Sequence, residues 1–337
     1  MRLCFGIDIS EDEIKSWEHE ILENLLLDHT TGENIIWATD DYKSHGEGYG
    51  FHDHITIEKI TGEHKMIIRP RVLKTKERQT GRSKGMAEIF TPSWVCNVQN
   101  NLVDEAWMKQ SNAFNVESEN SKTWEATSGK IEFTGEKTWK DYVHSTRLEI
   151  TCGEAPYLVS RYDTTTGISI PIEQRIGLLD RKLRVVSENA ETKDDWLYWS
   201  QVAYKNIYGY EWQGDSLLLA REALLLTFIE YYQAKFNDEM PNYENIRDIA
   251  SIISWNLWQM DGLKGVVPES CRNGIRKEMD MFGNVKEIEE KCPGCKKKLG
   301  NFWGHNGIYC TIADWKDDDT PSGEYTTKIR FIDLMKQ

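Results

Sequence analysis

Hydrophobic and polar positions follow two different periods along the chain. Apolar residues recur every three or four positions in residues 11–27 and again in residues 94–107, which predicts a helix in each stretch. Residues 54–60 instead alternate between apolar and polar, which predicts a strand that pairs with residues 65–68 across a turn at 61–62. Residues 112–138 are polar and irregular, as expected of an insertion.

The apolar run at residues 148–150 ends in a turn of small residues. Cys152 and Gly153 follow it, and Ala155 and Pro156 open another apolar stretch. Small residues let the backbone approach a ligand, and a helix N-terminus offers unpaired N–H groups. The pattern predicts a strand, a tight turn and a helix N-terminus at a ligand site, although an ordinary strand-to-helix turn has the same pattern.

A second strand and helix are expected in residues 206–229. Glu211 stands at the end of this strand, where a doubly wound sheet binds a ribose. Gly214 or Asp215 can cap the helix, and its apolar residues run almost continuously from 217 to 229. We therefore expect the helix to be buried on a sheet.

A third apolar segment, residues 249–263, ends in Asp261 and Gly262. Most of it has helical spacing, so only the last few residues before Asp261 are free to form a strand. Asp261 either accepts a hydrogen bond from an adenine amine or belongs to a turn that ends a core helix. The sequence leaves both interpretations open.

These three segments follow a Phe-Thr-Pro stretch within residues 87–94, and this order resembles the DNA adenine-N6 methyltransferases of restriction–modification systems. The resemblance covers roughly residues 86–265 and implies an α/β fold with a Rossmann-like S-adenosylmethionine-dependent methyltransferase core. It implies that the methionine part of the cofactor contacts Phe90, Thr91 and Pro92. The amino-acid end of the cofactor is then surrounded by Glu149, Cys152, Gly153 and Glu154. The ribose is bound by Glu211, and the adenine lies beside Trp212 with Asp261 at its edge.

The catalytic segment of that family, an Asn or Asp followed by Pro-Pro and an aromatic residue, is absent from the sequence. Residues 240–243 are the nearest similar stretch, but they follow a helix and precede Asp261. Residues 328–334 form the last apolar strand candidate. We therefore expect cofactor binding, with transfer to adenine in DNA through an unrecognised acceptor segment or a second subunit. The alternative is an inactive methyltransferase fold that binds DNA or a protein partner.

Charge is unevenly distributed. The formal net charge of −14 argues against a uniformly basic nucleic-acid binder. Residues 69–84 nevertheless carry one acid and seven basic residues, Arg69, Arg71, Lys74, Lys76, Arg78, Arg82 and Lys84. These side chains either follow a DNA backbone or belong to a solvated linker.

The C-terminal cysteines have the spacing of a metal site. Cys292, Cys295, His305 and Cys310 give a C-x2-C-x9-H-x4-C pattern, and Pro-Gly between the first two cysteines favours a tight turn. Four such ligands suit a structural zinc ion. Cys271 competes with His305 for a place among the ligands, and a pair of reduced thiols without metal is the alternative.

We expect three regions: an N-terminal α+β extension (1–85) with the basic segment, the methyltransferase-like core (86–270), and a zinc-knuckle-like module with the terminal strand (271–337). A chain with 39 % hydrophobic residues supplies a core. No apolar run approaches the roughly eighteen residues of a membrane span, and no signal peptide is recognisable at the start, so we expect a cytoplasmic protein that does not contact membranes.

Overall fold

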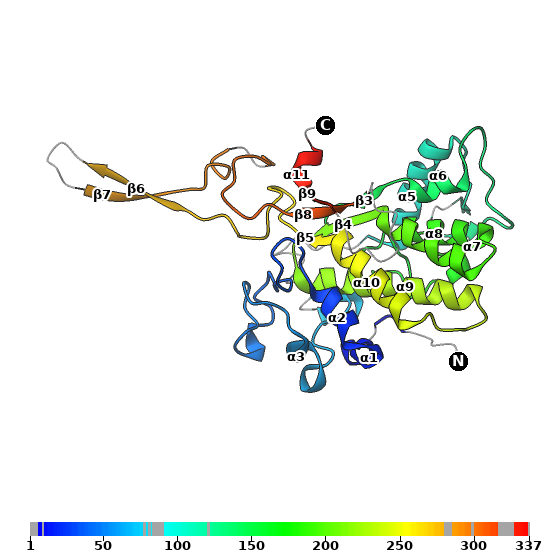
Figure 1. Ribbon diagram of the computed structural model, residues 1–337, viewed down its shortest axis with the longest axis horizontal. Coiled ribbons are helices and arrows are strands. Elements are labelled where there is room, and N and C mark those ends of the chain that lie inside the picture. Colours follow the sequence, from blue (N-terminus) through cyan, green and yellow to red (C-terminus); the bar gives the residue numbers. More distant parts are fainter. Residues whose placement is uncertain are drawn as a thin grey trace.

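The computed structural model describes residues 6–8, 10–76, 79, 82, 91–119, 122–279, 285–297, 300–315 and 327–335. It shows a mixed α/β protein in which helices surround several small sheets (Figure 1). None of the helices in these ranges combines the length and the apolar character that a membrane span requires.

The central element is a parallel sheet of three strands. Its strands are β3 (Arg147–Glu149), β4 (Ile207–Glu211) and β5 (Leu257–Gln259), hydrogen-bonded in that order. Parallel neighbours need a crossover connection. Two pairs of helices provide it: α7 (Leu178–Asn189) with α8 (Lys193–Lys205), and α9 (Gly214–Lys235) with α10 (Tyr243–Asn256).

Helix α9 is buried along nearly its whole length, which confirms the prediction for residues 217–229. Its N-cap is Gln213, so Gly214 and Asp215 belong to the first turn. The short strand before Asp261 is also confirmed, because α10 ends at Asn256 and only three residues form β5. The helix expected near Pro156 is replaced by turns, and the next α-helix after β3 begins at Leu178.

The N-terminal region contains α1 (Glu11–Trp17), α2 (His19–Leu26) and α3 (Ile57–Ile60), besides the 3-10 turns η1 (Lys43–His45), η2 (Gly62–His64) and η3 (Arg71–Leu73). The helical prediction for residues 11–27 holds for two helices separated by an extended Glu18. The strand prediction for residues 54–60 is wrong. Ile57 and Ile60, three positions apart, are both buried on one face of α3, so helical spacing prevails over alternation.

Helix α5 (Ser93–Met108) confirms the prediction for residues 94–107. The polar stretch after it contains a small hairpin of β1 (Asn115–Glu117) and β2 (Trp124–Ala126), followed by α6 (Trp139–His144). A further turn, η4 (Ile172–Gln174), precedes α7.

A second hydrophobic cluster covers the face of the sheet that carries Tyr210 and Trp258. It is closed by the hairpin of β8 (Thr311–Asp314) and β9 (Thr327–Arg330) and by α11 (Phe331–Leu334). The strand expected over residues 328–334 therefore ends at Arg330, and its second half is helical.

Strands β6 (Gly274–Met279) and β7 (Val285–Glu290) form an antiparallel ribbon that projects from the body of the molecule (Figure 1). Almost every residue of the two strands is exposed. An isolated two-stranded ribbon is at best marginally stable in water, so its base needs another source of stability.

Candidate metal centre and ligand cavity

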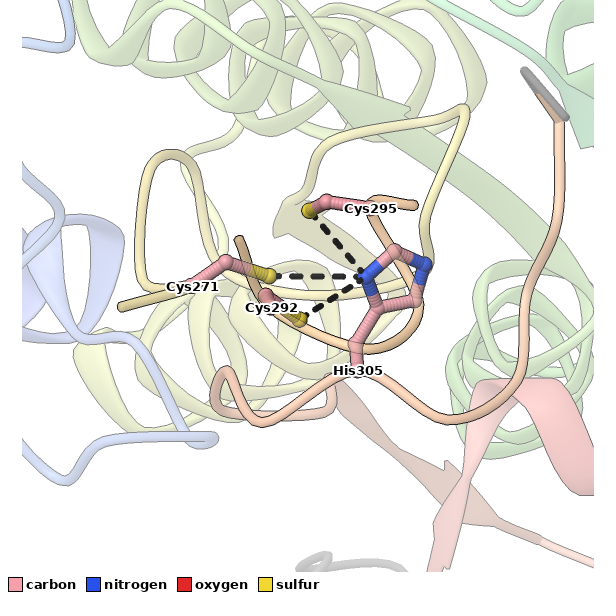
Figure 2. Close-up of side chains that lie close together, drawn as sticks. All are labelled: Cys271, Cys292, Cys295 and His305. Atoms are coloured by element: carbon pink, nitrogen blue, oxygen red, sulfur yellow. Dashed lines mark hydrogen bonds between the residues drawn. The ribbon is translucent and has the colours of Figure 1, made fainter. Parts of the chain in front are cut away.

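Four potential metal ligands meet at the base of this ribbon. Cys271 precedes β6, Cys292 and Cys295 follow β7, and His305 lies in the loop that leads to β8. Their ligand atoms all lie within 4.8 Å of one another. Figure 2 shows the three sulfur atoms gathered around one ring nitrogen of His305.

The distances within the cluster fit zinc. The His305 Nδ1 atom lies 3.5 Å from Cys271 Sγ, 3.8 Å from Cys292 Sγ and 3.6 Å from Cys295 Sγ. One ring nitrogen cannot make three hydrogen bonds at once. A tetrahedral zinc ion with usual bond lengths separates a sulfur from a nitrogen ligand by about 3.6 Å, so the four atoms have the spacing of a coordination shell.

Neighbouring groups act differently on the individual ligands. The second ring nitrogen of His305, Nε2, lies 2.7 Å from the carbonyl oxygen of Asn301, and an Nε2–H donated to that oxygen leaves Nδ1 free for metal. Burial opposes ionisation of the Cys292 thiol, but hydrogen bonds from the backbone N–H groups of Asn306 and Cys295 lower its pKa to about 6. Burial, with the nearby thiols of Cys295 and Cys292, raises the pKa of Cys271 to about 12.

Cys310 does not belong to this cluster, and its prediction as a ligand is wrong. The residue is fully buried in the second hydrophobic cluster, with its thiol 3.3 Å from the carbonyl oxygen of Gln259. Cys271 takes its place, because the antiparallel pairing of β6 and β7 brings Cys271 next to Cys292. Four protein ligands fill a tetrahedral shell, so this centre suits a structural rather than a catalytic ion.

A second candidate site is a cavity of about 1000 Å³ at the carboxyl ends of β3 and β4. Six of the predicted cofactor residues line it: Thr91, Glu149, Cys152, Gly153, Glu211 and Trp212. Parallel strands that end at the same edge of a sheet commonly form a ligand site there. The structure thus brings together segments that lie far apart in the sequence.

Both carboxyl groups of the cavity are held by backbone N–H groups. Glu211 accepts hydrogen bonds from Gly153 (2.8 Å), Trp212 (2.9 Å) and Gln213 (3.3 Å), which occupy three of its roughly four acceptor positions. Glu149 accepts longer hydrogen bonds from the loop at residues 157–158 (3.4 and 3.2 Å). Burial raises the pKa of Glu211, and it raises that of Glu149 well above its usual value.

The cavity wall is acidic. Among the described residues that line it, Glu149 and Glu211 are the only ones of type Asp, Glu, Lys, Arg or His. Lys74 and Arg82 are already paired with Asp215. Lys74 Nζ lies 3.2 Å and Arg82 Nη1 lies 2.9 Å from its carboxylate. These cations overcome the effect of burial and hold the pKa of Asp215 well below its usual range.

The remaining predicted cofactor residues lie elsewhere or outside the described residues. Glu154 is buried and accepts hydrogen bonds from the Arg71 backbone N–H (2.6 Å) and the Tyr162 hydroxyl (2.7 Å). Asp261 forms a turn beyond β5, with an ion pair to Lys264 at 2.8 Å. Pro92 is the N-cap of α5 and is not among the residues that line the cavity, whereas Phe90 lies outside the described part of the chain.

The basic segment is divided between surface and interior. Arg69 and Lys76 are exposed, and Arg71 is half-buried. Lys74 and Arg82 form the buried ion pairs with Asp215. Arg78 and Lys84 lie outside the described residues.

Sequence patterns did not indicate the part of the wall contributed by Ala38, Phe51 and α5. The ring of Phe51 lies edge-on to that of Trp212, with centroids 6.2 Å apart, and the Trp212 indole N–H donates to the Ala38 carbonyl. The Gln259 side chain donates to the carbonyl oxygens of Ile36 and Trp212 and accepts from the Ile36 N–H. A tertiary contact of this kind leaves no local signal in the sequence.

No protein-family model, curated protein or solved structure matches the chain. The geometry of the two sites is therefore the basis for assigning a function.

Proposed function

We propose that the protein binds S-adenosylmethionine and belongs to a DNA modification or restriction–modification system, in which it transfers methyl groups to adenine N6 with a second subunit or an unrecognised acceptor segment. The acidic cavity at the carboxyl ends of β3 and β4 carries this proposal. The parallel sheet with helical crossovers supports a Rossmann-like core around it.

The charge of the cavity favours this ligand over other adenosine compounds. Two carboxyl groups, the buried Glu149 and the half-buried Glu211, without a basic side chain among the described lining residues disfavour the phosphates of ATP or of a dinucleotide. S-adenosylmethionine carries a sulfonium and an ammonium group. Those cations compensate carboxylates that have lost their hydration, which also favours their ionised forms.

The arrangement of side chains supports one orientation of the ligand. Glu211 keeps one acceptor position for a ribose hydroxyl, and Trp212, held by its bond to Ala38, offers an aromatic face to adenine. The amino-acid end then lies toward Glu149 and Thr91. Neither Asp261 nor Gln259 is free to read the adenine edge, since the side chains of both are engaged in the contacts described above.

The experiment is calorimetric titration of zinc-loaded protein with S-adenosylmethionine and with ATP. Glu211→Gln should weaken binding of S-adenosylmethionine at least tenfold, because a hydrogen bond to a charged group contributes about 1.5–3 kcal/mol. Glu173→Gln, at an exposed position of η4, is the matched control. Binding of ATP in place of S-adenosylmethionine, or no binding of either ligand by folded protein, would refute the proposal.

A second candidate function is an inactive methyltransferase fold that binds DNA or a protein partner. Its support is the missing catalytic segment in the sequence. Transfer of labelled methyl groups to duplex DNA, with and without candidate subunits, separates the two functions. Cofactor binding without any transfer would favour the second.

A further inference from the structure

Asn100 presents a single unused polar atom to the cavity. The residue lies in α5, is 1 % exposed and lines the cavity wall. Its amide nitrogen donates to the carbonyl oxygens of Tyr157 and Ile176, both at 3.0 Å. These two bonds use both amide hydrogens and fix the orientation of the group. The amide oxygen, Oδ1, accepts no hydrogen bond from any residue that the structure describes.

Glu149 lies next to this amide. Tyr157 links them, because its carbonyl accepts from Asn100 and its N–H donates to Glu149 Oε1 at 3.4 Å. The two backbone N–H groups bound to Glu149 leave part of its acceptor capacity unused. One neutral and one acidic acceptor, joined through Tyr157, thus line the cavity wall.

We propose that Asn100 Oδ1 and the Glu149 carboxylate together bind the α-ammonium group of the ligand's amino-acid end. An ammonium group has three N–H donors and no acceptor, so it is satisfied by acceptors alone. Its positive charge compensates a carboxylate that burial would otherwise keep protonated. The inference rests on the proposed function and specifies which part of the ligand lies against α5.

The test compares S-adenosylhomocysteine with its deamino analogue, in which hydrogen replaces the α-ammonium group. Wild-type protein should bind the parent compound at least tenfold more tightly. Asn100→Ala should reduce this ratio to below threefold by weakening the parent compound while leaving the analogue unchanged. Asn256→Ala is the matched control, since this buried amide also donates to a backbone carbonyl, that of Tyr204 at 2.9 Å, but does not line the cavity.

The outcomes separate this inference from the proposed function. Equal binding of the two compounds by wild-type protein overturns the inference, and this comparison does not depend on the folding of a variant. An unchanged ratio in Asn100→Ala overturns the role of Asn100. Failure of wild-type protein to bind S-adenosylmethionine or either of these compounds overturns the proposed function itself, and the inference with it.

Discussion

Replacing Cys271 by serine tests the metal centre most directly. The structure includes this thiol in the cluster of four potential ligands and excludes the thiol of Cys310. Cys271→Ser and Cys310→Ser therefore form a matched pair, because both exchange one sulfur for one oxygen. Only the first should impair metal binding.

The size of the effect follows from the number of ligands. Loss of a group that merely supports a metal ligand typically weakens metal binding by 10- to 100-fold. Cys271 is one of four direct ligands, so its loss should weaken zinc binding by more than about 100-fold, equivalent to about 2.8 kcal/mol. The Cys310→Ser variant should bind zinc like the wild type, because a serine hydroxyl can still donate to the Gln259 carbonyl.

Two measurements check this prediction. Competition with a chromophoric chelator gives the relative zinc affinity of the three proteins. Cobalt substitution reports the ligand set, since a tetrahedral site with three thiolates gives intense visible bands and a strong sulfur-to-metal charge-transfer band. Loss of metal by Cys310→Ser but not by Cys271→Ser would refute the geometry described here.

Two further predictions concern packing and protonation. A Cβ atom added at Gly294 would lie 2.6 Å from the ring of His305, so Gly294→Ala should displace that ligand and lower zinc affinity. Gly274→Ala, where the nearest atom is 4.0 Å away, should leave the zinc affinity unchanged, and equal losses in both variants would contradict the prediction. His29 stacks on Trp255 with ring centroids 3.7 Å apart, and burial followed by the charge of nearby cations lowers its pKa to about 3. Because the folded pKa lies below the unfolded value of about 6.5, its contribution to stability is full above that pH and declines below it, by up to about 1.4 kcal/mol per pH unit. Urea unfolding at pH 7 and 5 should show a smaller pH dependence for His29→Phe, and an unchanged dependence would contradict this assignment.

Local patterns predicted the elements that depend on neighbouring residues. The helices at 11–27 and 94–107, the buried helix α9 and the short β5 all follow from apolar spacing. The hairpin predicted at 54–68 failed because the three apolar positions of residues 54–60 fit either period, and packing selected the helical one. The methyltransferase resemblance stays a prediction, although the structure gathers six of its expected cofactor residues around one cavity.

Tertiary contacts decided what the sequence left open. The sequence offered Cys271 only as a competitor of His305, because it lies 21 positions before Cys292 and only the pairing of β6 with β7 makes the two cysteines neighbours. Phe51 and Asn100 likewise reach the cavity through packing of distant segments. Motif spacing cannot identify such residues, because the number of positions between them in the sequence is not fixed by the site.

The bonds between Gln259 and Ile36 determine how the chain can be divided experimentally. A fragment that begins at residue 86 would retain the three parallel strands, but it would lose the wall formed by Ala38 and Phe51. It would also expose the amide of Gln259, which is now 2 % exposed. Truncated versions intended for crystallisation or ligand screening should therefore keep residues 34–55, or receive them as a separate peptide that restores the missing side of the cavity.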